Sequence, residues 1–290
     1  MDFHVMALTP QSDRGAAAIE AGKAKSKSLH LRGVPLVDES CGDVPYACVK
    51  YGMPVSLHEA KMQHFVAQAV NDQADAPVRV PLVYLFFQCG RRGYIVMEFI
   101  DGLGCTDFDA LLVADAVRSL IDIKSPTTAP GPLDEGPIVH HFFYDWRSPI
   151  AYDSVRALKK HVNAAYEGRS ERVDFQSEFE THGLPLCPCN LDPTNFMTDC
   201  EGRIVAIDFG ATCFLPRSFF DLALFLCHRP PALVRLLDRP RPEHLNVMLE
   251  AHVTLLLHGT NKIGVYLSLH SIHLVSFIIS YKSVIDLKLR

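Results

Sequence analysis

The stretch LCPCNLDPTNFM, Leu186 to Met197, and the segment IDFG, Ile207 to Gly210, decide how this sequence is interpreted. Asn195 lies near the end of the first stretch, and Asp208 follows it by thirteen positions. By themselves, these residues are typical of an Asn that caps a turn and an Asp at the end of a strand. This structural interpretation is the alternative to any role in binding.

The sequence around these two segments predicts a mainly helical second half. Apolar residues recur at helical spacing in three stretches, and a turn and a strand lie between the second and the third. The helices are expected at residues 106–124, 154–166 and 218–228, the turn at DCEGR and the strand at IVAIDFG. No internal repeat is visible.

The first hundred residues predict the order strand, helix, strand, strand. YACVKYG alternates as a strand does, and Ser56 with Glu59 three residues later forms a capping-box pattern at the start of a helix. VPLVYLFFQ and GYIVMEFI, separated by CGRRG, are typical of a hairpin. Residues 1–30 lack apolar periodicity, so we expect this segment to be poorly ordered.

Taken together, residues 30–230 resemble the fungal branch of the aminoglycoside and choline kinase-like phosphotransferases. The catalytic loop of that family resembles H-x-D-L-x-P-x-N-F, and the matching segment here is Pro188 to Phe196. The resemblance implies an α+β, two-lobed protein kinase-like fold. The N-lobe, 31–101, is expected to contain a small antiparallel sheet with one helix, and the C-lobe, 102–290, to be mainly helical with the catalytic and metal loops at 184–222.

The resemblance also implies two metal ligands and a nucleotide. In the family, residues at the positions of Asn195 and Asp208 bind Mg²⁺, which prefers oxygen donors and bridges the phosphates of ATP. Asp221 matches a position where the family often has an Asp that steadies the metal-binding loop, and helix capping is the alternative.

Five residues of the first half match nucleotide-binding positions of the family. Lys50 would hold the α- and β-phosphates, and Glu59 would orient Lys50. The backbone of Glu98, Phe99 and Ile100 would meet the adenine edge. Without the resemblance, these residues are a surface lysine, a capping carboxylate and the end of a buried strand.

The catalytic loop departs from the family pattern at two positions. Pro188 replaces the His, and Asn190 replaces the Asp that accepts the proton of the substrate hydroxyl. An amide orients a hydroxyl group but does not act as a general base near neutral pH. Asp192 is the alternative base, although its position in the family favours another orientation. The glycine-rich loop that covers the phosphates is also not recognisable before Lys50.

Three functional hypotheses follow. The first is aminoglycoside phosphotransferase-like, ATP- and Mg²⁺-dependent O-phosphorylation of a small-molecule hydroxyl acceptor, slow because Asn190 stands in for the catalytic Asp. The second is a nucleotide-binding pseudokinase or scaffold without phosphotransfer. The third is a degenerate protein that no longer folds fully, motivated by the unusual C-terminal region. The sequence predicts neither the identity of the acceptor molecule nor the oligomeric state.

Composition excludes several other classes. A net charge of −5 and a pI near 6.3 argue against nucleic-acid binding. Nine irregularly spaced cysteines and no apolar leader favour a cytoplasmic protein with reduced thiols, and the Cys187–Cys189 pair has no further ligands at zinc spacing. The 17 residues from Gly264 to Ser280 are fewer than the roughly 20 of a membrane span, so we expect a buried helix there.

Overall fold

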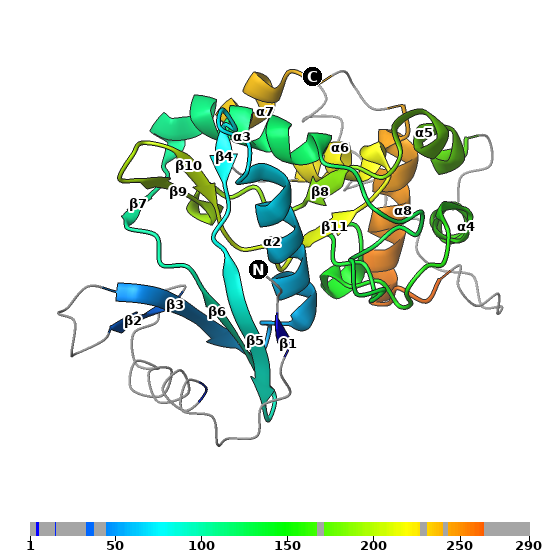
Figure 1. Ribbon diagram of the computed structural model, residues 1–290. Coiled ribbons are helices and arrows are strands. Elements are labelled where there is room, and N and C mark those ends of the chain that lie inside the picture. Colours follow the sequence, from blue (N-terminus) through cyan, green and yellow to red (C-terminus); the bar gives the residue numbers. More distant parts are fainter. Residues whose placement is uncertain are drawn as a thin grey trace.

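The structure is a computed structural model of the 290-residue chain, and it describes residues 4–5, 15, 33–37, 45–166, 171–226, 231–239 and 243–263. These residues form a part built on a five-stranded sheet and a larger, mainly helical part (Figure 1). None of the helices in these ranges is long and apolar enough to cross a membrane. The apolar stretch 264–280 lies outside the described residues.

The five-stranded sheet has the order β1-β5-β6-β3-β2. Its strands are β1 (His4–Val5), β2 (Val34–Val37), β3 (Pro45–Gly52), β5 (Val83–Cys89) and β6 (Arg92–Met97). All pairings are antiparallel except that of β1, which runs parallel to β5. The predicted hairpin is present as β5 and β6, with Gly90 at φ +60° in its turn. Apart from β1 and Gly15, the segment predicted to be poorly ordered lies outside the described residues.

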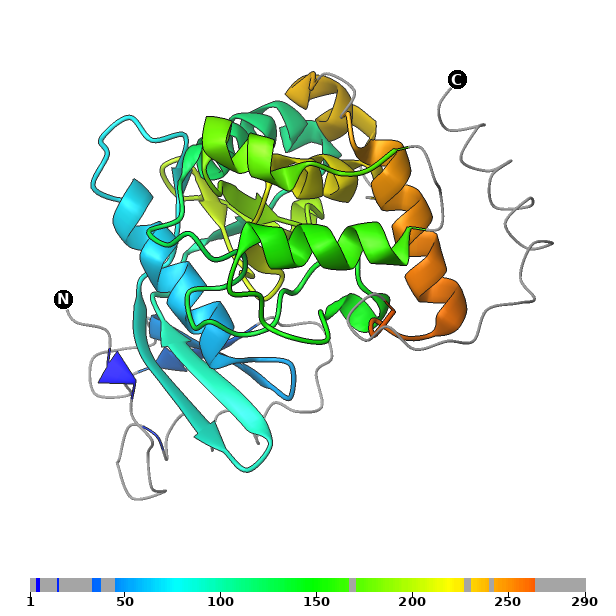
Figure 2. The ribbon, with the colours of Figure 1, turned by 90° about the vertical axis from the view of Figure 1, so that its right-hand side faces the viewer.

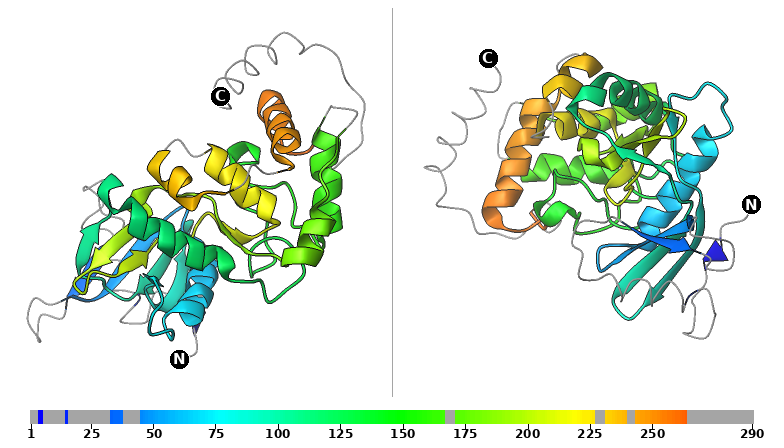
Figure 3. Two further views of the ribbon diagram at one scale, coloured as in Figure 1. Left: turned by 90° about the horizontal axis from the view of Figure 1, so that it is seen from above. Right: turned by 90° about the vertical axis from the view of Figure 1, so that its left-hand side faces the viewer.

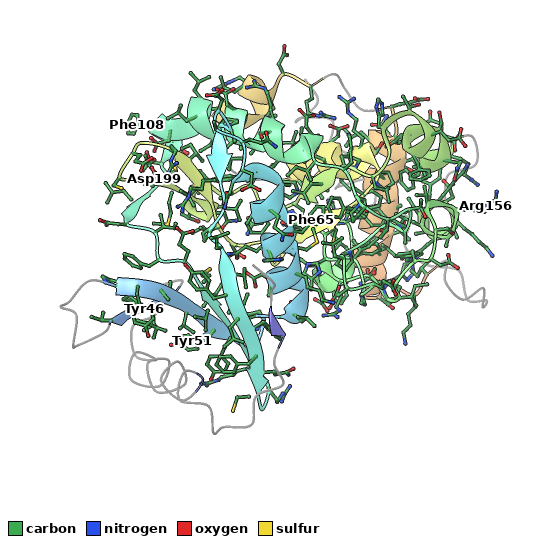
Figure 4. The ribbon with its side chains drawn as sticks, in the orientation of Figure 1. Tyr46, Tyr51, Phe65, Phe108, Arg156 and Asp199 are labelled. Carbon is green, nitrogen blue, oxygen red and sulfur yellow. The ribbon has the colours of Figure 1, made fainter. Side chains whose placement is uncertain are left out.

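Helix α2 (Leu57–Val70) joins the sheet to the helical part. Ala60 packs with Val83 and Ile95 of the sheet, whereas Met62, Val66 and Val70 belong to the large core of the helical part. Phe65 of α2 meets Phe214 edge to face with 5.6 Å between the ring centroids, and Figure 4 labels Phe65 at this junction. The helix therefore contributes to two cores at once.

A second sheet of four strands has the order β4-β10-β9-β7. Its strands are β4 (Val78–Arg79), β7 (Gly102–Gly104), β9 (Phe196–Asp199) and β10 (Ile204–Ala206). Strand β4 precedes the predicted lobe boundary at residue 101 but pairs with β10, in the helical part. Gly102 is required where β7 meets β9, because a Cβ there would lie 2.3 Å from the carbonyl oxygen of Thr198.

The helical part surrounds an aromatic core. Its helices are α3 (Ala110–Asp122), α4 (Val155–Ala165), α5 (Phe175–His182), α6 (Arg217–Leu226), α7 (Pro231–Leu237) and α8 (Leu245–His258), and β8 (Leu186–Pro188) pairs with β11 (Thr212–Phe214). Helix α4 packs against α8 (Figure 2), and α7 lies beside α3 (Figure 3). The predicted α+β fold, with a small sheet and one helix followed by a larger helical part, is confirmed.

His140 is a buried polar residue within this core. Its Nδ1 accepts a hydrogen bond of 2.9 Å from the Phe142 N–H, so Nε2 carries the proton and donates to the Phe219 carbonyl at 3.0 Å. Burial lowers the pKa of His140 to about 3, and His141 and His252 add to this shift. The folded protein therefore holds this imidazole neutral.

We predict that acid destabilises the protein partly through His140. Unfolded His140 takes up a proton near pH 6.5 and the folded residue only near pH 3, so between these values the unfolded state binds more protons. The free energy of unfolding should fall as the pH decreases, by at most about 1.4 kcal/mol per pH unit for this group. Urea denaturation between pH 7 and 4 should give a shallower decline for His140→Gln. Equal slopes would contradict the assignment.

Candidate functional site

Lys50 lies between two carboxylates that come from different parts of the fold. Its Nζ makes a short ion pair with Glu59 of α2 and lies 2.9 Å from Oδ1 of Asp208, which follows strand β10. Glu59 is only 2% exposed, compared with 16% for Lys50 and 32% for Asp208. The five-stranded sheet, helix α2 and the IDFG segment therefore meet at one ammonium group.

The pKa values at this centre reflect both burial and charge. Burial alone would lower the pKa of Lys50, but the carboxylates of Glu59 and Asp208 outweigh that effect and raise it. Burial raises the pKa of Glu59, and the Lys50 charge opposes this rise. The arrangement keeps the lysine protonated, as a group that binds phosphate must be.

Strand alternation explains why Lys50 faces the helix. Val49 and Tyr51 pack with Phe87 and Tyr94 on one face of the sheet, and Figure 4 labels Tyr51 on β3. Lys50 therefore points to the opposite face, where α2 lies. Ser56 accepts a hydrogen bond from the backbone N–H of Glu59 at 3.4 Å, so the predicted cap is present, while the Glu59 carboxylate pairs with Lys50.

Asn195 and Asp208 are brought together by strands β9 and β10. The Ile207 N–H donates to the Asn195 carbonyl oxygen at 2.8 Å, so the backbones before Asp208 and at Asn195 are directly hydrogen-bonded. Asp208 has φ +71°, a left-handed conformation that Asp adopts more readily than most residues and that turns the chain sharply after β10. Its carboxylate reaches Lys50 from this turn.

The amide of Asn195 holds the predicted catalytic loop in shape. Asn195 is 3% exposed, and its Nδ2 donates to the Asn190 carbonyl oxygen at 2.8 Å. Because the amide nitrogen is used in this bond, Oδ1 is the atom with which Asn195 would bind a metal ion. This hydrogen bond connects the predicted metal ligand Asn195 to Asn190, five residues earlier in the chain.

Asp192 caps the short turn within this loop. Its Oδ1 accepts hydrogen bonds from the Thr194 N–H at 2.9 Å and from the Thr194 hydroxyl at 2.5 Å. The turn is the 3-10 helix Pro193–Asn195. Pro188 lies in β8 opposite Thr212 of β11. The carboxylate of Asp192 therefore stabilises the turn, and these hydrogen bonds compete with a role as general base.

The predicted adenine-binding segment begins with a residue that is anchored by its side chain. The Glu98 carboxylate pairs with Arg79, and the Glu98 N–H donates to the Leu82 carbonyl oxygen at 2.8 Å. Phe99 and Ile100 are half-buried, and within the described ranges the backbone N–H of Ile100 has no protein acceptor. This segment thus presents backbone groups next to a fixed side chain.

Asp221 does not have the helix-capping role considered from the sequence. It lies within α6 (Arg217–Leu226), not at its start, so it is not a helix cap. Its carboxylate pairs with Arg239, whose guanidinium lies 5.3 Å from the Phe220 ring centroid. The pair joins α6 to the chain after α7, and the residue contributes to packing of the helical part.

Sequence reasoning missed several polar residues around the site. Arg79 and Gln63 contact the segment that leads to residue 98, and His58 Nδ1 lies 3.8 Å from Asp134 beside Glu59. No local signal marks these residues, because each contact joins segments that are distant in the chain. Of the elements that contain these residues, only the helix with His58 and Gln63 was predicted from the sequence.

The donor set fits a magnesium ion that arrives with a nucleotide. Within the described part of the chain, no group of three or more His, Cys, Asp or Glu side chains could hold a metal ion. Mg²⁺ usually binds one or two protein oxygen ligands together with substrate phosphates and water. Asn195 and Asp208 offer such a pair of oxygens, with the Lys50 charge beside them.

Comparison with known proteins shows similarity in structure only. No family model and no curated protein matches the sequence. Among solved structures, a candidate fructosamine-3-kinase from Haemophilus somnus 129PT is 16% identical with a TM-score of 0.45, covering 84% of each chain. An aminoglycoside phosphotransferase from Alicyclobacillus acidocaldarius is 12% identical with a TM-score of 0.42, covering 79% of this chain and 76% of its own.

A third solved structure contains ligands. A thermostable mutant of aminoglycoside phosphotransferase APH(4)-Ia, in a ternary complex with ADP and hygromycin B, is 14% identical with a TM-score of 0.46. The match covers 81% of this chain and 88% of that one.

We predict that Lys50→Met destabilises the fold, because Glu59 is then buried without its cation. Removing one partner of a buried ion pair costs about 3 kcal/mol or more, whereas replacing both partners with apolar residues costs less. Lys50→Met/Glu59→Leu should therefore be more stable than the single variant in urea denaturation. A double variant that is equally or less stable would show that Lys50 does not compensate Glu59.

Proposed function

We propose that this chain binds an Mg²⁺–adenine nucleotide and slowly transfers its terminal phosphoryl group to a small-molecule hydroxyl. The observation that carries the proposal is the contact of Lys50 with both Glu59 and Asp208. A structural lysine needs only one carboxylate partner. Here a second carboxylate comes from a left-handed turn that is hydrogen-bonded to the loop of Asn195.

Each residue of the centre then has a distinct task. Lys50 binds the α- and β-phosphates and is kept charged and oriented by Glu59. Asn195 and Asp208 bind Mg²⁺, which neutralises phosphate charge when bound. Lys50 must exchange its contact with Asp208 for phosphate oxygens, so the free protein should bind Mg²⁺ alone only weakly. This expectation follows from the 2.9 Å distance between Lys50 and Asp208.

The backbone of residues 98–100 would bind the base. The Ile100 N–H is a donor without an acceptor among the described residues, and it follows the anchored Glu98. An adenine edge offers both a donor and an acceptor to such a backbone. Phe99 lies between these two residues and completes the segment.

Asn190 explains why we propose slow transfer. A positioned general base contributes about 10²- to 10⁴-fold, whereas positioning and charge stabilisation supply most of phosphoryl transfer. The Asn195 side chain holds the Asn190 backbone carbonyl oxygen. The side-chain amide of Asn190 can orient an acceptor hydroxyl but does not take its proton. Transfer remains feasible, with the proton passing to water or phosphate.

A nucleotide-binding pseudokinase is the second candidate. Asp192 favours it, because both hydrogen bonds from Thr194 engage the carboxylate oxygen Oδ1 and hold it in the turn. If the proton of the acceptor does not pass to water or phosphate either, the same centre would bind the nucleotide without measurable turnover. The two candidates therefore share the binding site and differ in the chemical step.

We predict that millimolar MgATP raises the melting temperature of the wild type by several degrees. A ligand at 100 times its Kd stabilises by about 2.7 kcal/mol, and about 2–4 °C per kcal/mol is usual for chains of roughly 150–250 residues. The ATP-induced increase should be lost in Asp208→Ala and kept in Asp115→Ala, a matched Asp whose partner, Arg118, lies on α3. No increase for the wild type would refute nucleotide binding, and the same increase for Asp208→Ala would refute binding at Asp208.

A second prediction concerns turnover. Asn190→Asp should form ADP from MgATP about 10²-fold faster than the wild type or more, because it regains a general base. ADP formation is measured with water and with a panel of polyhydroxylated small molecules as acceptors. Asn190→Ser, which also lacks a base, serves as the control and should not gain. A wild type as fast as Asn190→Asp would contradict an impaired loop.

A further inference from the structure

Glu98 is hydrogen-bonded to Arg79 and Leu82 through both its side-chain carboxylate and its backbone N–H. Its carboxylate accepts hydrogen bonds from the guanidinium of Arg79 and, at 3.3 Å, from the Leu82 N–H. Its own backbone N–H donates to the Leu82 carbonyl oxygen at 2.8 Å. The start of the predicted base-binding segment is thus held at three points, two of which depend on the side chain.

Arg79 connects this segment to the strand that leads to the metal loop. Arg79 lies in β4, directly opposite Val205 in the parallel neighbour β10. Strand β10 ends at Ala206, and Asp208 follows two residues later. The Arg79–Glu98 ion pair therefore links the predicted base-binding segment to β4, and the pairing of β4 with β10 links it to the segment of Asp208.

The residues between Arg79 and Leu82 are also bound to helix α2. The Asn71 side chain donates to the Val80 carbonyl at 2.8 Å and accepts from the Val80 N–H at 3.0 Å. Gln63 Nε2 lies 2.9 Å from the Pro81 carbonyl oxygen and 3.3 Å from the sulfur of Met97. The segment 79–82 consequently contacts helix α2, which carries Glu59, the residue Glu98 itself, and strand β10, which leads to Asp208.

We propose that Arg79 and Glu98 are positioning residues for the adenine nucleotide, which fix residues 98–100 at the correct distance from Asp208. This inference rests on the proposed function and deepens it by separating recognition of the base from recognition of the phosphates. Neither residue touches the nucleotide through its side chain. The pair acts through the backbone that it holds.

Burial makes this pair more than a surface contact. Arg79 and Glu98 are 25% and 20% exposed, so solvent screens the pair less than it would at an open surface. Without the guanidinium, Glu98 would turn toward water and release the Leu82 N–H. The segment 98–100 would then shift relative to Asp208, so that the base and the phosphates no longer fit at the same time.

The test compares two probes that share the phosphate end. Calorimetry measures the Kd of MgATP and of magnesium tripolyphosphate, which lacks the base, for the wild type, Arg79→Met and Glu98→Gln. The reversed pair Arg79→Glu/Glu98→Arg tests rescue. Arg203→Met is the matched control, because Arg203 pairs with Asp199 in the same four-stranded sheet, at the turn between β9 and β10. Melting temperatures show that each variant is folded.

Arg79→Met and Glu98→Gln should each weaken MgATP binding about tenfold and leave tripolyphosphate binding within about twofold. The reversed pair should recover part of the affinity, since it restores the ion pair but not the bond from Leu82.

Equal losses for both probes, or an equal loss in Arg203→Met, would mean a general structural effect and overturn the inference. ATP binding by both variants as tight as that of the wild type would overturn this inference and leave the proposed function intact. A wild type that binds tripolyphosphate and ATP equally, or neither, would refute the proposed function as well.

Discussion

The ion pairs of Lys50 constrain the arrangement of the whole site. Glu59 is almost completely buried, so its charge is tolerated only while α2 packs against the sheet and places it at the ammonium group. Asp208 reaches the same group only from a left-handed turn after β10. The ion pairs of Lys50, as well as the apolar contacts of α2, thus hold the two parts of the molecule in position relative to each other.

Local patterns made much of this arrangement predictable. Alternation in residues 46–52 placed Lys50 on one face of a strand, and Ser56 marked the start of α2, as the structure shows. The resemblance, rather than the residues alone, placed Asn195 and Asp208 in adjacent loops, and strands β9 and β10 join these two segments. The position of Lys50 on its strand and the start of α2 depend on a few consecutive residues, so the sequence alone reveals them.

Features that depend on distant segments were not predictable. Strand β4 contains two residues and forms only because β10 lies beside it, and no periodicity marks so short a strand. For the same reason, Arg239 was not recognised as the partner of Asp221, which we had considered as a helix cap or a support of the metal loop. Glu59 was also considered as a capping carboxylate, but its carboxylate meets Lys50, and only its backbone N–H meets Ser56.

A crystal structure of the chain with Mg²⁺ and a non-hydrolysable ATP analogue tests the central claim most directly. The account predicts that Lys50 leaves Asp208 for the α- and β-phosphates while it keeps Glu59, and that the metal ion lies between Asn195 and Asp208. The base should contact the backbone of residues 98–100. A nucleotide bound elsewhere, or one bound here with the Lys50–Asp208 contact intact and no metal at Asp208, would contradict the account.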